Sequence, residues 1–586
     1  MTNNASVTLT DDQRSWLRRF VDKPDAVLAS GNVAARLFRT AVEIPLRTAI
    51  FEPHDAWGRR TYRAESFGQL LEVTEQYAQG LSRRGIQPGM RTVLMVSPSR
   101  DFVRLVYALL QLGAVPVLVD PGMGTKNLAE CLEEARPEAF VGVVKAHLAR
   151  WLFGWAKTSV RISVTVSELP WFPAGATTRS FRPRIPDEFP TPFHLANPDD
   201  PAAVLFTSGS TGVPKGAVYT HGMFCAQVDQ LRQTFGIERG EIDLCTFPLF
   251  ALFAPALGMT SVIPKMDFTR PARVDPREVL EPVEQFHVTN LFGSPALLDR
   301  VGRAAEKVWT HGSVPDTQTL QRVISAGAPV SPQILERFAK LLPPGGGEIF
   351  TPYGATESLP VAVIGSNEVL NDTRHNTADG AGTCVGRPVP GIDVRIIRIF
   401  DGPIAAWSDD LVLPTGEVGE IAVFGPVVSQ EYFHRPDLSA LAKIPDHQRG
   451  RCWHRMGDVG YFDERGRLWF CGRKSQRVVT PKRTCFTDPV EGVFNAHPAV
   501  FRTALVGVDR GGATEPVLCV ELEKTAKPRA AAEVTRELLE LGSRHEHTRE
   551  IRTILYHDGF PVDIRHNSKI FREQLAAWAA QQLTSR

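Results

Sequence analysis

One twelve-residue string limits the fold of this chain more than any other feature. It reads Leu205-Phe-Thr-Ser-Gly-Ser-Thr-Gly-Val-Pro-Lys-Gly216 and leaves an apolar strand that we predict over residues 202–208. Its glycines let backbone N–H groups approach an anion closely, its hydroxyl groups add hydrogen-bond donors, and its lysine adds a positive charge. These groups suit a polyphosphate. Pro214 precedes the lysine, so the string is not a G-x-x-x-x-G-K-[ST] loop.

The alternative for a run of serine and glycine is a flexible surface turn. Here the run follows a strand and precedes a helix that we predict over residues 221–235, so we favour an anion-binding loop. The residues that we assign to phosphate binding are Thr207, Ser208, Gly209, Ser210, Thr211, Gly212 and Lys215.

The hydrophobic pattern around this loop predicts repeated β-α-β units, which imply a parallel sheet. The predicted elements cover residues 92–98, 101–112 and 115–119, then 202–208 and 221–235, then 322–325 with a helix that has Ser331 as its N-cap and Pro332 at its first position. Beyond about residue 473 the pattern changes to strands at 503–508 and 517–523 and a helix near 530–542.

We therefore predict an α/β fold in two domains. Residues 1–473 would form a large domain of parallel-rich sheets and helices, and residues 474–586 a small, mobile α+β domain. Residues 170–192 and 366–381 are polar or rich in proline, and we predict loops there.

The charge balance excludes one broad class of function. The chain has 66 Lys and Arg against 65 Asp and Glu, a formal net charge of +1, which gives no support to a nucleic-acid partner bound through a basic surface. The eight cysteines form no C-x-x-C pair, so zinc-ribbon and dithiol sites are excluded too. Scattered single cysteines are typical of reduced thiols in the cytoplasm.

The stretch Leu244–Pro264 contains no charged residue and is long enough to cross a bilayer. Three prolines interrupt it, and a proline inside a helix costs about 3 kcal/mol. We therefore predict a buried apolar wall and not a transmembrane segment. The N-terminal residues lack the apolar core of a secretory signal, so we expect a cytoplasmic location.

The glycine-rich string closely resembles the phosphate loop of the adenylate-forming superfamily, which contains acyl-CoA synthetases, luciferases and the adenylation domains of peptide synthetases. Further motifs similar to those of the family follow in the family's order over about residues 60–575. They are Ser325-Ala-Gly-Ala-Pro329, Tyr353-Gly-Ala-Thr-Glu357, Gly386-Arg-Pro-Val-Pro-Gly391, Gly457-Asp458, Gly472-Arg473-Lys474 and Asn567-Ser-Lys-Ile570. One such motif would be weak, but the ordered set is highly specific.

The resemblance implies that a carboxylate is joined to the α-phosphate of ATP, with Mg²⁺ as cofactor, to give an acyl-adenylate and pyrophosphate. Two anions must meet, so the site must supply positive charge and hydrogen-bond donors. The resemblance implies that the residues from Thr207 to Lys215 bind the β- and γ-phosphates, that Glu357 and Thr207 bind Mg²⁺, and that Thr356 contacts the α-phosphate. It also implies that adenine stacks on Tyr353, that Asp458 binds the ribose, and that Arg473 contacts the ribose or a phosphate. Further nucleotide contacts would come from Gly327, Ala328, Pro329 and Gly354.

Lys569 matches the catalytic lysine that the family carries near its C-terminus, which would bridge the carboxylate and the α-phosphate. Taken alone, such a lysine would be an exposed surface residue. The resemblance also implies that the C-terminal domain rotates between two half-reactions. The hinge would lie at Lys474, for which the alternative is an ordinary exposed lysine.

The sequence departs from acyl-CoA ligases at three places. Pro481 and Lys482 stand where the family carries adjacent glycines that receive the pantetheine arm, which puts CoA as the acceptor in doubt. Ala251 stands where relatives often have a histidine, and Ser568 where a glycine precedes the lysine. The apolar run around Ala251 fits the wall of a tunnel for long alkyl chains, with plain core as its alternative.

These departures resemble one branch of the superfamily, the β-lactone synthetases of bacterial long-chain olefin biosynthesis. The strings that carry this likeness are Phe247-Pro-Leu-Phe-Ala-Leu-Phe253, Arg270-Pro-Ala-Arg-Val-Asp-Pro276 and Arg565-His-Asn-Ser-Lys569. The likeness implies adenylation of a long-chain 2-alkyl-3-hydroxy fatty acid, attack by its own 3-hydroxyl, and release of a β-lactone and AMP. It also implies partner enzymes that supply the hydroxy acid and decarboxylate the lactone. His287, predicted before a strand near the pocket, is one candidate base, and a structural role is its alternative.

Two other functions stay open at this point. A long-chain fatty acyl-CoA or acyl-carrier-protein ligase would use the same first half-reaction, and consumption of CoA thiol would favour it. A non-catalytic adenylate-binding scaffold or sensor is the third hypothesis. Retention of Lys215, Glu357 and Lys569 together argues against that hypothesis.

Overall fold

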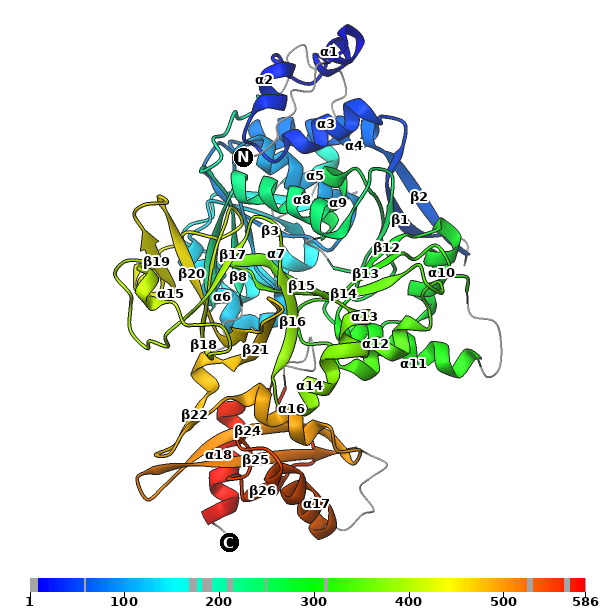
Figure 1. The fold of residues 1–586 in the computed structure, drawn as a ribbon. Coiled ribbons are helices and arrows are strands. Elements are labelled where there is room, and N and C mark those ends of the chain that lie inside the picture. Colours follow the sequence, from blue (N-terminus) through cyan, green and yellow to red (C-terminus); the bar gives the residue numbers. More distant parts are fainter. Residues whose placement is uncertain are drawn as a thin grey trace.

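The computed structural model describes residues 9–56, 59–167, 176–181, 192–207, 214–247, 250–309, 315–523, 531–562 and 570–584. Figure 1 shows a large body built on two sheets and, below it in the view, a small body made by the C-terminal part of the chain. Strands and helices alternate through most of the large body. The predicted α/β class is therefore confirmed.

The first sheet has seven strands in the order β7-β6-β5-β3-β4-β8-β9, all parallel except β9 against β8. The strands are β3 (Arg91–Met95), β4 (Val115–Leu118), β5 (Ala139–Val143), β6 (Ile162–Val166), β7 (Ala176–Thr177), β8 (Pro201–Thr207) and β9 (Lys215–Thr220). The first predicted β-α-β unit is confirmed as β3, helix α5 (Arg100–Gln111) and β4. Helix α5 begins after Ser99, whose hydroxyl accepts a hydrogen bond from Phe102 N at 3.1 Å.

The second sheet has fourteen strands in the order β17-β18-β20-β21-β16-β15-β14-β13-β12-β10-β11-β1-β2, with β19 paired to β20. The strands are β1 (Thr48–Ala56), β2 (Arg59–Ser66), β10 (Ile242–Cys245), β11 (Thr260–Val262), β12 (Asn290–Phe292), β13 (Arg322–Ile324), β14 (Glu348–Ala355), β15 (Ser358–Gly365), β16 (Thr383–Pro388), β17 (Asp393–Ile397), β18 (Gly419–Phe424), β19 (Lys443–Asp446), β20 (Arg451–Phe462) and β21 (Leu468–Arg473). From β1 to β14 the pairs are parallel, and from β14 to β17 they are antiparallel.

Helices pack on both sheets and enclose the core (Figure 1). They include α1 (Asp11–Leu17), α2 (Pro24–Ala29), α3 (Ala35–Glu43), α4 (Phe67–Ser82), α6 (Thr125–Ala135), α7 (Val144–Phe153), α8 (His221–Phe235), α9 (Phe250–Leu257), α10 (Arg277–Phe286), α11 (Pro295–Trp309), α12 (Pro332–Ala339) and α15 (Pro436–Ala442). Phe38, Leu70, Leu71, Leu105 and Leu109 from α3, α4 and α5 are buried in one cluster. Burial of each such side chain contributes about 1.5–3 kcal/mol.

Helix α12 begins as predicted, with Ser331 at the N-cap and Pro332 at the first helical position. The Ser331 side chain, however, makes no capping hydrogen bond. The fixed φ angle of Pro332 suits the first turn of the helix even though this capping hydrogen bond is absent.

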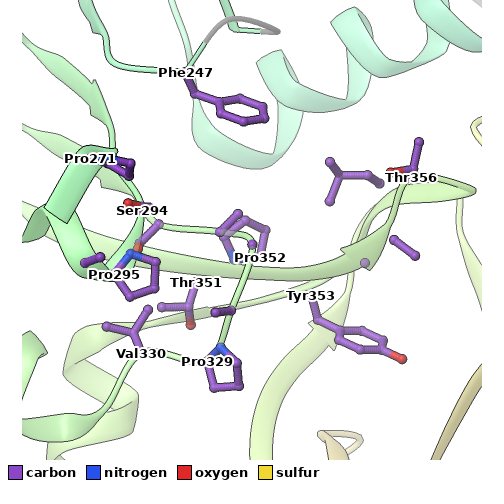
Figure 2. Close-up of a pocket in the computed structure, with 18 of the residues that line it drawn as sticks. Phe247, Pro271, Ser294, Pro295, Pro329, Val330, Thr351, Pro352, Tyr353 and Thr356 are labelled. Atoms are coloured by element: carbon purple, nitrogen blue, oxygen red, sulfur yellow. The ribbon is translucent and has the colours of Figure 1, made fainter. Parts of the chain in front are cut away.

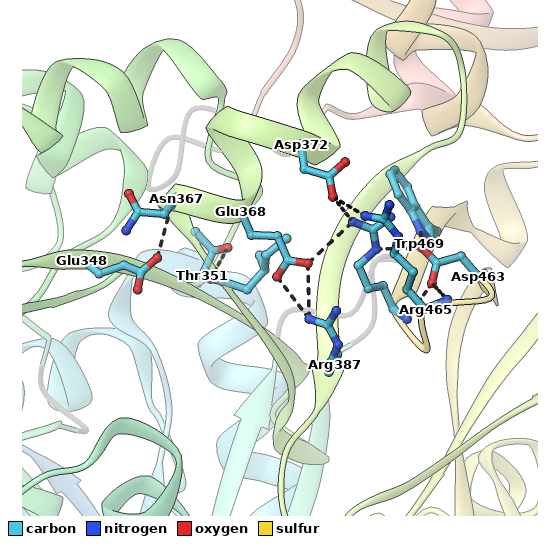
Figure 3. A network of polar contacts seen from close by, with 11 residues as sticks. Glu348, Thr351, Asn367, Glu368, Asp372, Arg387, Asp463, Arg465 and Trp469 are labelled. Carbon is cyan, nitrogen blue, oxygen red and sulfur yellow. Dashed lines mark hydrogen bonds and ion pairs between the residues drawn. The ribbon is translucent and has the colours of Figure 1, made fainter.

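The prediction of a loop over residues 366–381 is wrong. The segment forms helix α13 (Ser366–Glu368), a π-helix (Val369–Thr373) and helix α14 (Arg374–Ala378). Its charged side chains pair with distant partners: Asp372 contacts Arg465 at 2.9 Å (Figure 3). It also contacts Arg467 at 2.7 Å. Those partners lie about ninety residues later in the chain, so the local sequence does not show that the polar side chains are paired. The polar pattern alone is typical of a solvated loop.

The small body contains β24 (Val500–Arg510), β25 (Ala513–Leu522), β26 (Thr553–Tyr556), α16 (Thr487–Asn495), α17 (Ala531–Ser543) and α18 (Arg572–Thr584), with a hairpin of β22 (Val478–Val479) and β23 (Thr484–Cys485). The predicted strands and helix of this region are thus confirmed. Strand β25 pairs antiparallel with β24 and parallel with β26. Arg572 of α18 holds Glu491 of α16 through contacts of 2.6 and 2.9 Å, which ties the two helices together.

The apolar stretch Leu244–Pro264 spans the end of β10, helix α9 and strand β11. Ala254, Ala256 and Leu257 are buried in a core cluster with residues of α8. The middle of the stretch is therefore ordinary core. No helix in the described ranges is both long and apolar enough to cross a membrane.

A buried polar row crosses the parallel part of the large sheet. Asp243, Asn290 and Arg322 lie opposite one another on β10, β12 and β13. Asn290 Nδ2 donates a hydrogen bond to Asp243 Oδ1, and Arg322 pairs with Glu241 at 2.7 Å. Burial raises the pKa of the fully enclosed Asp243 carboxyl group to about 7.

Replacing Asp243 by asparagine should flatten the pH dependence of stability. Between about pH 4 and pH 7 the folded wild type keeps a proton on Asp243 that the unfolded chain releases, so its stability falls as the pH rises. From about pH 5.5 to pH 8.5 the free energy of unfolding of the wild type should drop by about 2 kcal/mol relative to Asp243→Asn. Urea unfolding of both proteins at the two pH values measures this, and equal pH dependence would contradict it.

Candidate active site

A large open cleft of about 2550 Å³ lies between the two bodies and is lined by residues of both. Its wall includes Ser294, Ser325 and Thr351, at or just beyond the carboxyl ends of β12, β13 and the parallel part of β14. Ligands of parallel α/β sheets bind at this edge. The predicted site residues that line the cleft are Lys215, Gly327, Ala328, Pro329, Tyr353, Gly354, Thr356, Glu357, Asp458 and Arg473. Figure 2 shows how the stretch from Thr351 to Thr356 and the loop at Pro329 face the same space.

The remaining predicted residues are described only in part. Ser208, Gly209, Ser210, Thr211, Gly212 and Lys569 lie outside the described residues. The backbone of Thr207 ends β8 and pairs with Lys215 at the start of β9, and helix α8 follows as predicted. The glycine-rich string therefore joins two antiparallel strands at the edge of the first sheet.

Thr356 and Glu357 form the two-residue loop of the hairpin between β14 and β15. The loop is held from two sides: Tyr219 donates its hydroxyl to Thr356 O, and Ser429 N donates to Glu357 O at 2.9 Å. A Cβ on Gly354 would lie 2.7 Å from Ser358 O, so only glycine fits the close approach beside this loop.

Glu357 is almost fully buried, yet it lines the cleft. Its Oε1 accepts a hydrogen bond of 2.6 Å from the Tyr432 hydroxyl. Burial and the adjacent carboxylate raise the pKa of Tyr432, so this phenol stays a donor. The Lys215 and Lys443 ammonium groups lie 5.3 and 5.5 Å from the centre of the Tyr432 ring, within the range of a cation–π contact.

The segment that carries Tyr432 also joins the two sheets. Tyr432 forms an antiparallel bridge with Ala217 of β9, and Phe433 N donates to Gly216 O at 2.7 Å. One short segment thus contacts both the strand that leaves the glycine-rich string and the carboxylate of Glu357. We name residues 431–433 the clasp segment.

Lys443 and His454 complete a cluster next to Glu357 that the sequence did not predict. They face each other in the β19–β20 ladder, and His454 lines the cleft. Lys443 donates to Ser429 Oγ at 2.9 Å, and burial lowers its pKa to about 7. Burial and the nearby Lys443 hold the pKa of His454 well below its usual range. A negative charge bound in the cleft would favour the protonated form of Lys443.

No local motif marks Tyr219, Tyr432, Lys443 or His454 as site residues. Tyr219 and Lys443 are buried in strands without a recognisable motif, and Tyr432 lies in an irregular segment. Their contacts join elements that are far apart in the sequence. Tyr219 and Thr356, for example, are more than a hundred residues apart. Only the folded structure brings such pairs together.

Asp458, Arg473 and Tyr353 form a second polar group in the cleft. Asp458 and Arg473 are cross-strand partners on β20 and β21, and their side chains pair at 2.7 Å. The Tyr353 hydroxyl donates to Asp458 Oδ2 at 2.6 Å. Each carboxylate oxygen has a further lone pair, so Asp458 could also accept the two hydroxyl groups of a ribose. Burial raises the pKa of Asp458, and the Asp458 charge raises that of Arg473.

His287 precedes strand β12 as predicted, but its position argues against the hypothesis that it is the base. His287 is exposed at the end of α10, in a left-handed conformation with φ +52°, and is not among the residues that line the cleft. It precedes β12, so it lies at the amino end of the parallel strands. The cleft lies at their carboxyl end.

Two further predictions concern the connection to the small body. Lys474 follows β21, donates to Phe400 O at 2.7 Å and pairs with buried Glu420 at 3.0 Å. Pro481 and Lys482 form the turn of the β22–β23 hairpin, where Lys482 is exposed and lies 3.6 Å from Glu550. The hinge role of Lys474 and the loss of a pantetheine loop both stay predictions.

Comparisons with known proteins agree with this geometry. The model of the AMP-binding enzyme family matches residues 37–433. The chain is 48% identical over 559 residues to the olefin β-lactone synthetase of Xanthomonas campestris pv. campestris, covering 94% of this chain and 98% of that protein. It is 47% identical over 572 residues to the olefin β-lactone synthetase of Stenotrophomonas maltophilia, covering 95% and 99%.

The fold also resembles that of a solved structure. The amide bond synthetase of Marinactinospora thermotolerans aligns with a TM-score of 0.74 at 22% identity, over 93% of this chain and 99% of that one. At this identity the likeness concerns the fold alone, which is that of adenylate-forming enzymes. The family match and the two relatives show that the chain belongs to the AMP-binding enzyme family, on the branch of the olefin β-lactone synthetases.

Proposed function

We propose that this enzyme is an ATP-dependent β-lactone synthetase. It first adenylates a long-chain 2-alkyl-3-hydroxy fatty acid, which releases pyrophosphate, and then forms a β-lactone with release of AMP. The observation that carries the proposal is the meeting of Lys215, Glu357 and Asp458 in one cleft, in a chain nearly half identical to olefin β-lactone synthetases along almost its whole length.

The nucleotide would lie along the polar part of the cleft. The glycine-rich string and Lys215 would hold the β- and γ-phosphates, and Thr356 would contact the α-phosphate. The ring of Tyr353 offers a flat surface for adenine, and Asp458 with Arg473 would hold the ribose. Lys569 would bridge the substrate carboxylate and the α-phosphate.

The residues near Glu357 fit Mg²⁺. Tyr432 fixes one oxygen of a carboxylate that lines the cleft, and Mg²⁺ prefers carboxylate oxygen while keeping several water ligands. In the part of the chain that the structure describes, no group of three or more His, Cys, Asp or Glu could hold a metal ion. Mg²⁺ would therefore take its other ligands from phosphate, water and Thr207, and would offset phosphate charge.

Part of the cleft wall suits alkyl chains. Its apolar residues include Phe247, Ile263, Met266, Phe268 and Phe292. The two ends of the apolar stretch Leu244–Pro264 therefore contribute to the cleft wall, whereas its middle is part of the core. A second, nearly apolar cavity lies under α9 and is small as it stands. An apolar wall next to a phosphate site is what a long-chain acid requires.

Ring closure needs no second substrate. The 3-hydroxyl oxygen attacks the carbonyl carbon, a new C–O bond forms, the bond to the AMP oxygen breaks, and the hydroxyl proton leaves. Because the nucleophile is already attached to the substrate, little translational entropy is lost. The protein must fold the substrate so that its hydroxyl points at the carbonyl carbon. The relatives' names further support a place in olefin formation. A cytoplasmic location, and partner enzymes that supply the acid and decarboxylate the lactone, belong to the same proposal.

Product analysis tests the proposal directly. The full chain, Mg²⁺, ATP and a synthetic long-chain 2-alkyl-3-hydroxy acid should give AMP, pyrophosphate and a β-lactone carbonyl signal in the NMR spectrum without CoA. The matched acid without the 3-hydroxyl group should release pyrophosphate but form no lactone. Thioester formed on addition of CoA or an acyl carrier protein, with no lactone, would replace the proposal by an acyl-transfer ligase.

Lys569→Ala should abolish pyrophosphate release and leave ATP binding nearly intact. A charge that contacts carboxylate and α-phosphate together acts in the transition state more than in the bound nucleotide. Rapid-quench assays give the first quantity and calorimetric titration the second. Lys482→Ala, which removes an exposed lysine from the same small body, is the control and should match the wild type. An unchanged rate in Lys569→Ala would refute the role.

Tyr432→Phe should slow adenylation roughly tenfold or more and raise the Mg²⁺ concentration needed for half-maximal rate. It removes a hydrogen bond to a carboxylate, an interaction of about 1.5–3 kcal/mol, while keeping the ring. Tyr461→Phe is the matched control, since its hydroxyl donates to Ala381 O at 3.1 Å. Equal Mg²⁺ dependence in both variants would show that Tyr432 does not position Glu357.

A further inference from the structure

Helix α7 presents its apolar residues to solvent instead of to the core. Leu148, Trp151, Leu152 and Phe153 are 55%, 84%, 69% and 51% exposed. The side that faces the sheet is small or polar: His147 is buried, and its Nε2 lies 3.0 Å from Val164 O. A surface helix of a globular protein normally has the opposite arrangement. We name the four exposed apolar residues the α7 surface.

The lysine and arginine residues of the segment that carries the α7 surface have no acidic counterpart within that segment. Residues 144–161 contain Lys145, Arg150, Lys157 and Arg161 and no Asp or Glu. Arg150 points inward and donates to Ser163 Oγ at 3.1 Å, whereas the other three are exposed. Lys145 lies three residues before Leu148 and seven before Leu152, so the three share one helix face. The segment therefore joins an apolar stripe to a basic border.

The same helix borders the cleft. Lys145, Ala146 and Ala149 of α7, together with Trp155 just after it, are among the residues that line the cleft. Phe153 stacks on Trp155 with 5.4 Å between ring centres, which connects the exposed surface to the cleft wall. A molecule held at the α7 surface would thus lie beside an entrance to the site.

We propose that the α7 surface docks this enzyme on an anionic lipid membrane. Exposed tryptophan, leucine and phenylalanine with a border of lysine and arginine is the composition of helices that lie in a membrane interface. Negatively charged headgroups attract each basic residue near the surface. The complementary charge favours a lipid surface, and a protein partner is the competing occupant. We infer the docking from the α7 surface alone. The further inference that docking delivers long-chain acids to the site depends on the function proposed above.

Vesicle sedimentation tests the docking with the full chain. The protein should sediment with vesicles of phosphatidylglycerol and phosphatidylcholine, less with phosphatidylcholine alone, and less as salt is added. Trp151→Ser/Leu152→Ser should lower the partition coefficient on anionic vesicles by on the order of tenfold or more. Lys157→Glu/Arg161→Glu should lower it on anionic vesicles only. The control Leu46→Ser changes an apolar residue outside α7 that is 92% exposed, and should bind as the wild type does.

Each outcome decides the proposal. No sedimentation with anionic vesicles, or equal sedimentation of the Trp151→Ser/Leu152→Ser variant, would overturn it. Association between protein chains that this variant abolishes, without vesicle binding, would assign the surface to a protein partner and also overturn it. Unchanged thermal unfolding confirms that the variants fold. Unchanged activity of the variants on a short-chain hydroxy acid in solution separates loss of docking from loss of the catalytic function.

Discussion

The hydrogen bond between Tyr432 and Glu357 ties the two halves of the active site together. Glu357 lies in the loop at the end of β14 in the large sheet, whereas Lys215 begins β9 in the other sheet. The clasp segment pairs with β9 through its backbone and with Glu357 through its phenol. Two elements of the proposed nucleotide site, from separate sheets, are therefore placed by one short stretch of chain. Electrostatic catalysis depends on such fixed positions, because donors and charges that need not reorganise act most strongly.

The cleft lies between a floor in the large body and a cover formed by the small body. The floor includes strand ends and a hairpin loop of the large sheet, which carry Ser325, Tyr353 and Glu357. The cover is the small body, joined to β21 through Lys474. Lys474 contacts Glu420 and Phe400 O in the large body, so a rotation there would have to break both contacts. If the predicted rotation takes place at Lys474, this ion pair would favour the arrangement that the structure describes.

The sequence could predict those features that arise from local patterns or from ordered motifs. The β-α-β units, the small α+β body and the ten predicted residues that line the cleft belong to this class, since period, glycine position and motif order are all local. The polar helices at 366–378 were not predicted because their partners, such as Arg465 and Arg467 for Asp372, lie far along the chain. The antiparallel half of the large sheet was missed for a similar reason, because strand partners are set by topology. The sequence did not indicate where His287 lies relative to the cleft, because a pattern does not tell which end of a strand faces the ligand.

The clasp segment also sets a limit on how such an enzyme can be altered. The glycine-rich string, the hairpin loop with Glu357 and residues 431–433 are three separate stretches of sequence that fold against one another. Exchange of any one of them with a distant relative would leave the other two shaped for the missing partner. Recombination and engineering should therefore treat the three stretches as a single inherited unit, even though more than two hundred residues separate the first from the last.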